Sequence, residues 1–275
     1  NSAAVVQALA AGQTMIDTIV FTSADGTTQT QTITITGAND AASITVAATD
    51  TVVTEDDGAN NTATGTVSVT DVDDGEGTLD TAVASFGTVT VDGGGSWEYS
   101  LNNSDAAVQA LPIGATLTDS IVFTSDDGST QTQVITITGA NDAAGITVTA
   151  VDTVVTEDDG ADNTASGTVS VTDVDTGEGT LDTAVASFGT VTVDGAGNWI
   201  YTLDNSAAEV QALPEGATLN DTIVFTTDDG TTQTQTVLIS GANDFQSINV
   251  TVTDTAVTED DAGNNTAAGT VSVTD

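Results

Sequence analysis

Carboxylates are the side chains of this sequence that are best able to do specific chemistry. The 275 residues include 41 Asp and Glu and contain no Lys, Arg, His or Cys. No nucleophile can therefore be activated by a histidine or lysine, and no thiol can serve as one. Oxygen ligands gathered at one place suit a hard cation, and calcium, which takes six to eight oxygens, fits better than magnesium. Whether the chain can form such a cation site depends on whether its acids are scattered along the sequence or gathered in a few places.

The acids gather in short phrases that recur along the chain. These phrases are GAND at 37–40, 139–142 and 241–244; TEDD at 54–57, 156–159 and 258–261; TDVD at 70–73 and 172–175; and SDDG or TDDG at 125–128 and 227–230. Each recurrence is offset by 102 residues, as from Asp40 to Asp142, without insertion or deletion. A period of this length indicates one whole domain per repeat and not a solenoid of shorter units.

Each repeat has the pattern of an immunoglobulin-like β-sandwich. Branched and polar residues alternate along residues 44–53, 64–72, 78–86, 88–91, 96–101, 116–124 and 130–138, with turn signals between them. The predicted fold class is therefore all-β, as tandem seven-stranded sandwiches. The period divides the chain into the C-terminal part of one repeat (1–42), two full repeats (43–142 and 143–244) and the N-terminal part of a further repeat (245–275).

Strand direction is expected to bring the acidic phrases together. If strands alternate up and down, TEDD lies at the pole where the chain leaves a repeat, beside the linker 140–142. The next repeat then presents TDVD and TDDG to the same linker. Two carboxylates 4 Å apart repel by about 4 kcal/mol at an effective dielectric of 20. Either a divalent cation closes such a junction or the junction stays open. The alternative is that Asp, Asn and Gly serve here only as ordinary turn formers.

The same phrases carry a family resemblance. GTVSVTDVDTGEG, FGTVTVDGAGNWIYTLDNSAAEVQAL and TVLISGAND resemble the VCBS-type repeats of giant bacterial repeats-in-toxin adhesins, which are related to cadherin-like sandwich domains. The likeness extends over essentially all 275 residues. It implies calcium held by a linker Asn-Asp, an Asp-x-Asp of the following domain, an Asp of its last hairpin turn and a Glu of the preceding domain. The matching residues are Asn141, Asp142, Asp173, Asp175, Asp229 and Glu55.

The repeat period extends these candidates to the other junctions. The full set of candidate calcium ligands is Asn39, Asp40, Glu55, Asp56, Asp71, Asp73, Asp127, Asn141, Asp142, Glu157, Asp158, Asp173, Asp175, Asp229, Asn243, Asp244 and Asp275. At the last hairpin turn Ala24 stands where Asp126 and Asp228 occur, so the second acid of that turn is the candidate. The Asp-Arg-Glu element of cadherins has no counterpart, which implies fewer ligands from the preceding domain.

Composition also excludes some partners. Without Lys or Arg the chain cannot neutralise phosphates, so nucleic acid is excluded, and an anionic membrane surface would repel it. Paired carboxylates can hydrolyse glycosides, but a hydrolase has one cleft, whereas these acids recur in every copy, so we expect no enzyme. Trp97, Tyr99 and Leu101 share one strand face. That face either fills the core or forms a carbohydrate-binding stripe.

The function expected from the residues and the resemblance is that of a structural extender. Repeats stacked end to end, stiffened by calcium at their junctions, would project an adhesive domain from a bacterial cell surface and support adhesion or biofilm formation. The expected location is extracellular, and the expected partners are neighbouring repeats of the same chain. Two alternatives remain open: lateral assembly of copies into a filament or matrix, and repeats that themselves bind a glycan.

Overall fold

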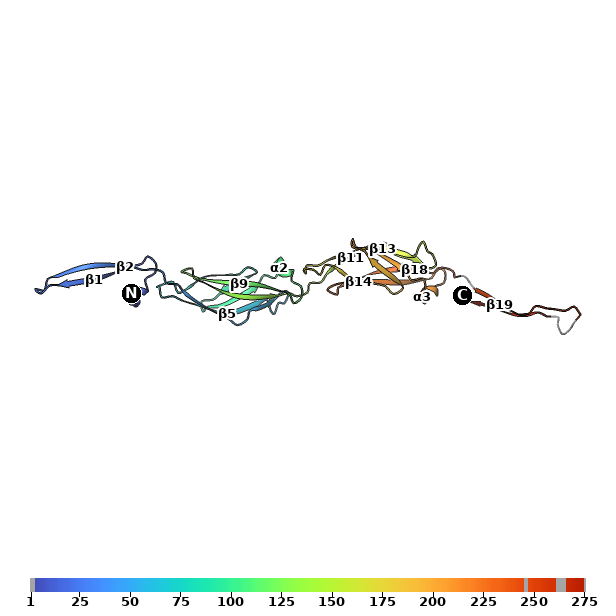
Figure 1. The fold of residues 1–275 in the computed structure, drawn as a ribbon, viewed down its shortest axis with the longest axis horizontal. Helices are drawn as coiled ribbons and strands as arrows, with labels where there is room; N and C mark the ends of the chain where they lie inside the picture. Colours follow the sequence, from blue (N-terminus) through green and yellow to red (C-terminus); the bar gives the residue numbers. More distant parts are fainter. Residues whose placement is uncertain (1–2, 245–246, 261–265, 275) are drawn as a thin grey trace. The chain divides into compact units, whose positions relative to one another are not determined.

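A computed structural model describes residues 3–244, 247–260 and 266–274, and the chain in it falls into two compact units (Figure 1). Unit 1 comprises Asn1–Ala143 with Asp173–Glu178, and unit 2 comprises Ala144–Thr172 with Gly179–Asp275. Within the described residues, no helix has the length and apolar character that crossing a membrane requires.

Unit 1 contains a complete sandwich of two four-stranded sheets. One sheet has the order β3-β5-β8-β7, from Ser43–Ala48, Thr62–Thr70, Ser96–Leu101 and Gly87–Val91. The other has the order β4-β10-β9-β6, from Val52–Thr54, Thr130–Thr138, Thr116–Ser125 and Leu79–Val83. One helical turn, α2 (Ala106–Gln109), links β8 to β9, and the Asp105 side chain caps it by accepting from the Ala107 N–H.

Unit 2 repeats this architecture with the same strand order. Its first sheet is β11-β13-β16-β15, from Gly145–Asp152, Thr164–Thr172, Asn198–Leu203 and Gly189–Val193. Its second sheet is β12-β18-β17-β14, from Val154–Thr156, Thr232–Ser240, Thr218–Thr227 and Leu181–Val185, with α3 at Ala208–Gln211.

Two hairpins are partial copies of the same sandwich. In unit 1, α1 (Ala4–Gln7) precedes the pair β1 (Thr14–Thr22) and β2 (Thr28–Thr36); in unit 2, β19 (Ser247–Asp254) pairs with β20 (Ala268–Thr274). Phe21 of β1 is 57% exposed, whereas Phe123 and Phe225, one and two periods later, are fully buried. The strands that cover Phe123 and Phe225 have no counterpart among residues 1–42.

The prediction of an all-β sandwich is confirmed, with one refinement. Residues 44–53, predicted as one strand, form two strands, β3 and β4, that belong to different sheets. The chain passes from one sheet to the other near Asp50. The Asp50 side chain accepts from the Val52 N–H at 3.0 Å, and the backbone N–H groups of Thr49 and Asp50 donate to Thr64 O. Each full repeat therefore has eight strands and not seven.

The aromatic residues of β8 fill the core and are not displayed to solvent. Trp97 and Tyr99 are almost fully buried, and the Trp97 ring lies 6.2 Å from that of Phe123, tilted by 55°. Such tilted pairs add packing energy beyond the buried area. Of the two interpretations open from the sequence, the structure supports core packing and not a carbohydrate stripe.

Gly65 on β5 allows this packing, which gives a first prediction. A Cβ at Gly65 would lie 2.3 Å from Ala47 O and 2.5 Å from Trp97 Cζ2. We expect Gly65→Ala to lower the free energy of unfolding by about 1–3 kcal/mol, as overpacking typically does. Gly58→Ala is the control, because a Cβ there meets no described atom within 4 Å. Urea unfolding of the two variants compares them, and equal stability would contradict the packing argument.

Candidate metal centre

Glu55 lies in the turn that follows β4, and the chain fixes it firmly. Its N–H donates to Thr138 O at 3.0 Å, and its side chain is 1% exposed. Its Oε1 accepts from the Ala140 N–H at 2.8 Å, whereas no described residue hydrogen-bonds to its Oε2. The following residue, Asp56, adopts a left-handed conformation with φ of 52°, which Asp tolerates better than most residues. The TEDD turn is thus shaped to hold one buried carboxylate against the linker.

Asp173 and Asp175 lie in the turn after β13, in the segment that belongs to unit 1. Asp173 Oδ1 accepts from the Asp175 N–H at 2.9 Å, and Asp175 Oδ2 accepts from the Asp142 N–H at 2.8 Å. Within the described part of the chain, Asp142 Oδ2, Asp173 Oδ2 and Asp175 Oδ1 are buried and have no hydrogen-bond partner. Glu55, Asp56, Asp142, Asp173 and Asp175 together are called the Asp142 cluster below.

The electrostatics of the Asp142 cluster disfavour its ionised form. Burial raises the pKa of Glu55, and the negative charges of Asp142 and Asp175 raise it further. Burial also raises the pKa of Asp142, followed by the charges of Asp56 and Asp175. Both effects disfavour a negative charge. The cluster therefore holds carboxylates that the surrounding protein does not neutralise.

Asp56 is held by two residues that the sequence analysis missed. Asn103 Nδ2 donates to Asp56 Oδ1 at 2.5 Å, and the Asp56 N–H donates back to Asn103 Oδ1 at 2.8 Å. Gln109 Nε2 lies 3.4 Å from the same Asp56 oxygen, and the Asn103 amide is the main reason that the pKa of Asp56 is lowered. The recurrence of Asn205 and Gln211 one period later was a signal for both residues, but periodicity alone does not say what they contact.

A second acidic group in unit 1 surrounds the linker 40–42. The Asp40 N–H donates to Asp73 Oδ2 at 2.8 Å, and the Ala42 N–H donates to Asp127 Oδ2 at 2.9 Å. The Ser125 hydroxyl and the Ala42 and Ser129 N–H groups hold the pKa of Asp127 well below its usual range. Glu76, which the sequence analysis did not single out, joins this group: burial, then Asp73 and Asp71, raise its pKa.

Unit 2 repeats parts of both arrangements. Glu157 Oε1 accepts from the Ala242 N–H at 2.7 Å, burial raises the pKa of Glu157, and the charges of Asp244 and Asp158 add to this. Asp229 Oδ2 accepts from the Ala144 N–H at 3.0 Å, and the hydroxyls of Thr227 and Thr231 hold the pKa of Asp229 far below its usual range. The sequence-predicted residues therefore hold backbone N–H groups in each unit.

The structure distributes the remaining candidates differently. Asn39, Asn141 and Asn243 each donate their side-chain amide to the carbonyl of the next residue, at 3.0, 2.8 and 3.0 Å. Asp229 belongs to unit 2, whereas the Asp142 cluster belongs to unit 1, and Asp275 lies outside the described residues. Among the described residues, no three or more Asp and Glu side chains converge into a ready-made metal-binding arrangement. The donor chemistry nevertheless fits a hard cation, because the free groups are buried carboxylate oxygens.

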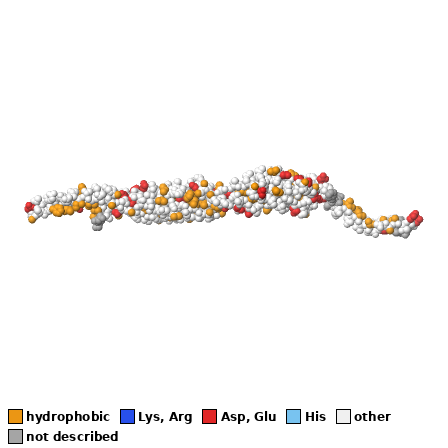
Figure 2. Space-filling view, turned by 45° about the horizontal axis from the view of Figure 1, so that its top comes forward, with side chains coloured by type: hydrophobic (Ala, Val, Ile, Leu, Met, Phe, Trp, Pro, Cys, Tyr) orange, Lys and Arg blue, Asp and Glu red, His pale blue; other side chains and the backbone are white. Residues whose placement is uncertain are grey.

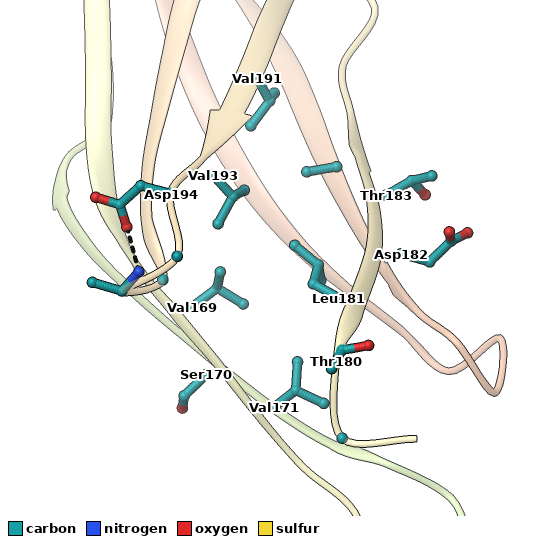
Figure 3. A pocket seen from close by; sticks show the side chains of 15 residues that line it. Val169, Ser170, Val171, Thr180, Leu181, Asp182, Thr183, Val191, Val193 and Asp194 are labelled. Carbon is teal, nitrogen blue, oxygen red and sulfur yellow. Dashed lines mark hydrogen bonds between the residues drawn. The ribbon is translucent and has the colours of Figure 1, made fainter. Parts of the chain in front are cut away.

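Each full repeat also carries a groove of mixed polar and apolar lining, which in unit 2 lies between β13, β14 and β15. In unit 2 it has a volume of about 640 Å³, and its counterpart in unit 1 has about 590 Å³. Figure 3 shows Val169, Leu181 and Val193 pointing into it, whereas Asp182 points away. Asp194 caps its own turn by accepting from the Ala196 and Asn198 N–H groups, each at 2.9 Å. Asp182 and Asp194, the two acids that line the groove of unit 2, therefore do not face each other.

Comparisons with known proteins give structural likenesses only. No protein-family model and no curated protein matches the chain. It is similar to the protocadherin gammaB4 extracellular domain (12% identity, 93% of this chain, 47% of that one, TM-score 0.43). It is also similar to protocadherin gammaB7 EC3-6 in a cis-dimer structure (15% identity, 74% of this chain, 50% of that one, TM-score 0.44) and to the human desmocollin-1 ectodomain (14% identity, 81% of this chain, 47% of that one, TM-score 0.34). The chain spans about half the length of these proteins. None of the likenesses is close enough to assign a family.

Proposed function

We propose that this chain is an extender segment of a large secreted bacterial adhesin and that calcium bound at the Asp142 cluster orders the linker between repeats 43–142 and 143–244. The observation that supports this most is a set of four buried carboxylate oxygens without a hydrogen-bond donor among the described residues. They are Glu55 Oε2, Asp142 Oδ2, Asp173 Oδ2 and Asp175 Oδ1. The chain has no Lys, Arg or His, so none of its own side chains can offset a negative charge on these groups, whereas a bound cation can.

The residues that would hold the ion are Glu55, Asp142, Asp173 and Asp175, with Asp56 beside them. When bound, calcium supplies the positive charge that offsets repulsion among these carboxylates. The chain's own contribution is to position them: Ala140 and Asp142 N–H groups orient Glu55 and Asp175, and Asn103 orients Asp56. Calcium is preferred to magnesium because a carboxylate-rich, loop-borne set tolerates irregular coordination, whereas magnesium demands near-octahedral geometry and keeps several waters.

The proposal predicts that calcium stabilises the full chain. Extracellular calcium modules bind with affinities of about 10⁻⁴–10⁻³ M. Calcium at about 10⁻² M should therefore raise the unfolding free energy by roughly 1.4–2.7 kcal/mol. Calorimetry in chelator, in magnesium and in calcium measures the effect, and small-angle scattering measures the maximum dimension, which we expect to fall in chelator. If neither the melting temperature nor the maximum dimension responds to calcium, the proposal is wrong.

A substitution at Asp142 separates the ion from ordinary turn chemistry. Asp142→Asn removes a carboxylate whose ionised form is disfavoured in the folded chain. We expect the variant to unfold at a higher temperature than the native chain in chelator, and to bind calcium at least about tenfold more weakly because a ligand charge is lost. Asp182→Asn on β14, an exposed acid outside the cluster, is the matched control. If Asp142→Asn lowers stability equally with and without calcium, Asp142 has a structural role only.

A further inference from the structure

The sequence holds eight Asp-Gly pairs, which are places where a protein main chain can rearrange without an enzyme. The aspartates of these pairs are Asp25, Asp57, Asp74, Asp92, Asp127, Asp159, Asp194 and Asp229. Glycine has no Cβ, so its backbone nitrogen is open to the side-chain carbon of the aspartate before it. Exposure alone does not select one pair, because red carboxylates appear at many places on the side that Figure 2 draws. The hydrogen bonds of each pair therefore decide which of them is free to react.

Seven of the eight aspartates are held by hydrogen bonds within their own turns. Asp57 Oδ1 accepts from the Ala59 N–H at 2.9 Å. Asp92 Oδ1 accepts from the N–H groups of Gly94 and Ser96, at 2.9 and 2.8 Å. Backbone N–H groups hold five further carboxylates in the same way, those of Asp25, Asp127, Asp159, Asp194 and Asp229. Each of these carboxylates must give up a hydrogen bond before its carbon can turn toward the next nitrogen.

In three of these turns the glycine nitrogen is held as well. The N–H groups of Gly26, Gly128 and Gly230 donate to the carbonyl oxygen three residues earlier, at 3.0, 2.9 and 2.9 Å. These are the turns of the hairpins β1–β2, β9–β10 and β17–β18. Both groups that would have to form a bond are therefore fixed there.

Asp74 is the exception among the eight aspartates. Within the described part of the chain, no donor hydrogen-bonds to its carboxylate and no acceptor takes the Gly75 N–H. Both residues are exposed, Gly75 has a φ of 89°, and a Cβ on it would meet no atom within 4 Å. The turn is closed only by the Glu76 N–H donating to Asp73 O at 3.4 Å, which is a long hydrogen bond. Asp74 and Gly75 therefore have the carboxyl group and the nitrogen that are free to approach each other.

We propose that Asp74 is a site of spontaneous isomerisation to isoaspartate. The Gly75 nitrogen attacks Cγ of the protonated Asp74 carboxyl group; the N–Cγ bond forms, the nitrogen loses its proton, and the carboxyl OH leaves as water. The product is a succinimide ring. Water then opens the ring either at Cγ, which restores aspartate, or at the main-chain carbonyl carbon, which leaves the main chain running through Cγ. One water leaves and one water enters, so the sequence of steps needs no oxidant, reductant or enzyme.

The rearrangement lengthens the main chain by one carbon directly after Asp73. Asp73 is 3% exposed, and its Oδ2 accepts from the Asp40 N–H at 2.8 Å. The Asp74 N–H itself donates to Ala8 O at 3.0 Å. Both hydrogen bonds tie this turn to the partial repeat 1–42, so isomerisation loosens them as the protein ages. The inference rests neither on calcium nor on an extender role, so it stands or falls separately from the function proposed above.

Incubation of the full chain in warm, mildly acidic buffer with chelator tests this inference. Because the chain has no Lys or Arg, peptides are made by cleavage after glutamate, and mass-spectrometric fragmentation that separates isoaspartate from aspartate reads each pair. We expect isoaspartate to accumulate at position 74 at least about tenfold faster than at the seven held pairs, since each of those must first break a hydrogen bond. In urea, where the turns are lost, all eight pairs should react at similar rates.

The equivalent turn one period later offers matched variants. Thr176 stands where Asp74 does and is also followed by glycine, and its N–H donates to Ala110 O at 3.2 Å. Thr176→Asp should therefore create isoaspartate at position 176 at a rate comparable to that at position 74. Asp74→Thr should keep its melting temperature during the incubation, while that of the native chain falls.

Three results would overturn the proposal. The first is isoaspartate at position 74 that forms no faster than at the held pairs of the folded chain. The second is the same preference for position 74 in urea, which would assign it to the local sequence and not to the fold. The third is a Thr176→Asp chain that stays unmodified at position 176. An equal fall in melting temperature for the native chain and Asp74→Thr would overturn the loosening of the turn.

Discussion

Asp119→Ala is expected to lower the free energy of unfolding of the unit 1 sandwich by about 3–5 kcal/mol, since several buried donors would lose their acceptor at once. Asp119 on β9 is 2% exposed. Its Oδ2 accepts from Tyr99 Oη at 3.0 Å and from the Phe86 N–H at 2.7 Å, and its Oδ1 accepts from the Ser85 and Ser120 N–H groups at 3.0 and 2.7 Å. One carboxylate therefore ties both sheets to the segment that joins β6 to β7.

The comparison variant is Asp80→Ala, which removes an exposed acid of the same sandwich and should change stability by less than about 0.5 kcal/mol. Asp221→Ala in unit 2 should repeat the large effect, because Asp221 accepts from Tyr201, Ser187, Phe188 and Thr222 in the same way. Urea unfolding of the full chain measures both. A loss below about 1 kcal/mol for Asp119→Ala would show that the buried donors find other acceptors.

Alkaline pH should unfold the chain through two residues alone. Tyr99 and Tyr201 are the only tyrosines, and no Lys, Arg or Cys is present to titrate above neutral pH. Burial raises the pKa of both tyrosines, and the Asp119 and Asp221 carboxylates raise it further. The unfolded chain loses these protons near pH 10, whereas the folded chain keeps them. Stability is therefore fully present below about pH 10 and falls above it by about 1.4 kcal/mol per pH unit for each tyrosine.

Tyr99→Phe with Tyr201→Phe isolates this effect. At neutral pH the double variant should be less stable, because each substitution removes a hydrogen bond to a carboxylate, which is typically worth about 1.5–3 kcal/mol. Above pH 10 its stability should stay nearly constant, so the two stability curves converge as pH rises. Thermal unfolding monitored by circular dichroism from neutral pH to about pH 12 measures this. The same alkaline loss in both proteins would show that the tyrosines do not cause it.

The sequence predicted the sandwich well because its evidence is local. Alternation of branched and polar residues defines strands, and the turn phrases define their ends, so β5, β8, β9 and β10 lie within two residues of the predicted ranges. The division of residues 44–53 was missed, since a strand that changes sheets keeps its alternation. Only the hydrogen bonds of Thr49, Asp50 and Val52 reveal it.

The Asp142 cluster was predicted in part. Strand direction was enough to expect Glu55, Asp56, Asp142, Asp173 and Asp175 near one linker. It could not show that Glu55 and Asp175 already hold backbone N–H groups, or that Asn103 anchors Asp56. It also overlooked Asp119 and Glu76, because a buried acid and a turn acid look alike in a sequence. Burial depends on contacts between strands that are far apart in the chain.

By itself, the sequence determined the 102-residue repeat, the all-β class and the complete lack of positive side chains, because each is a property of residue order and type. The tertiary structure alone decided which of the acids carry buried oxygens without a hydrogen-bond donor and which are satisfied in the core. Those properties arise from pairing across strands, and the interaction of a carboxylate depends on its burial and on its neighbours in space.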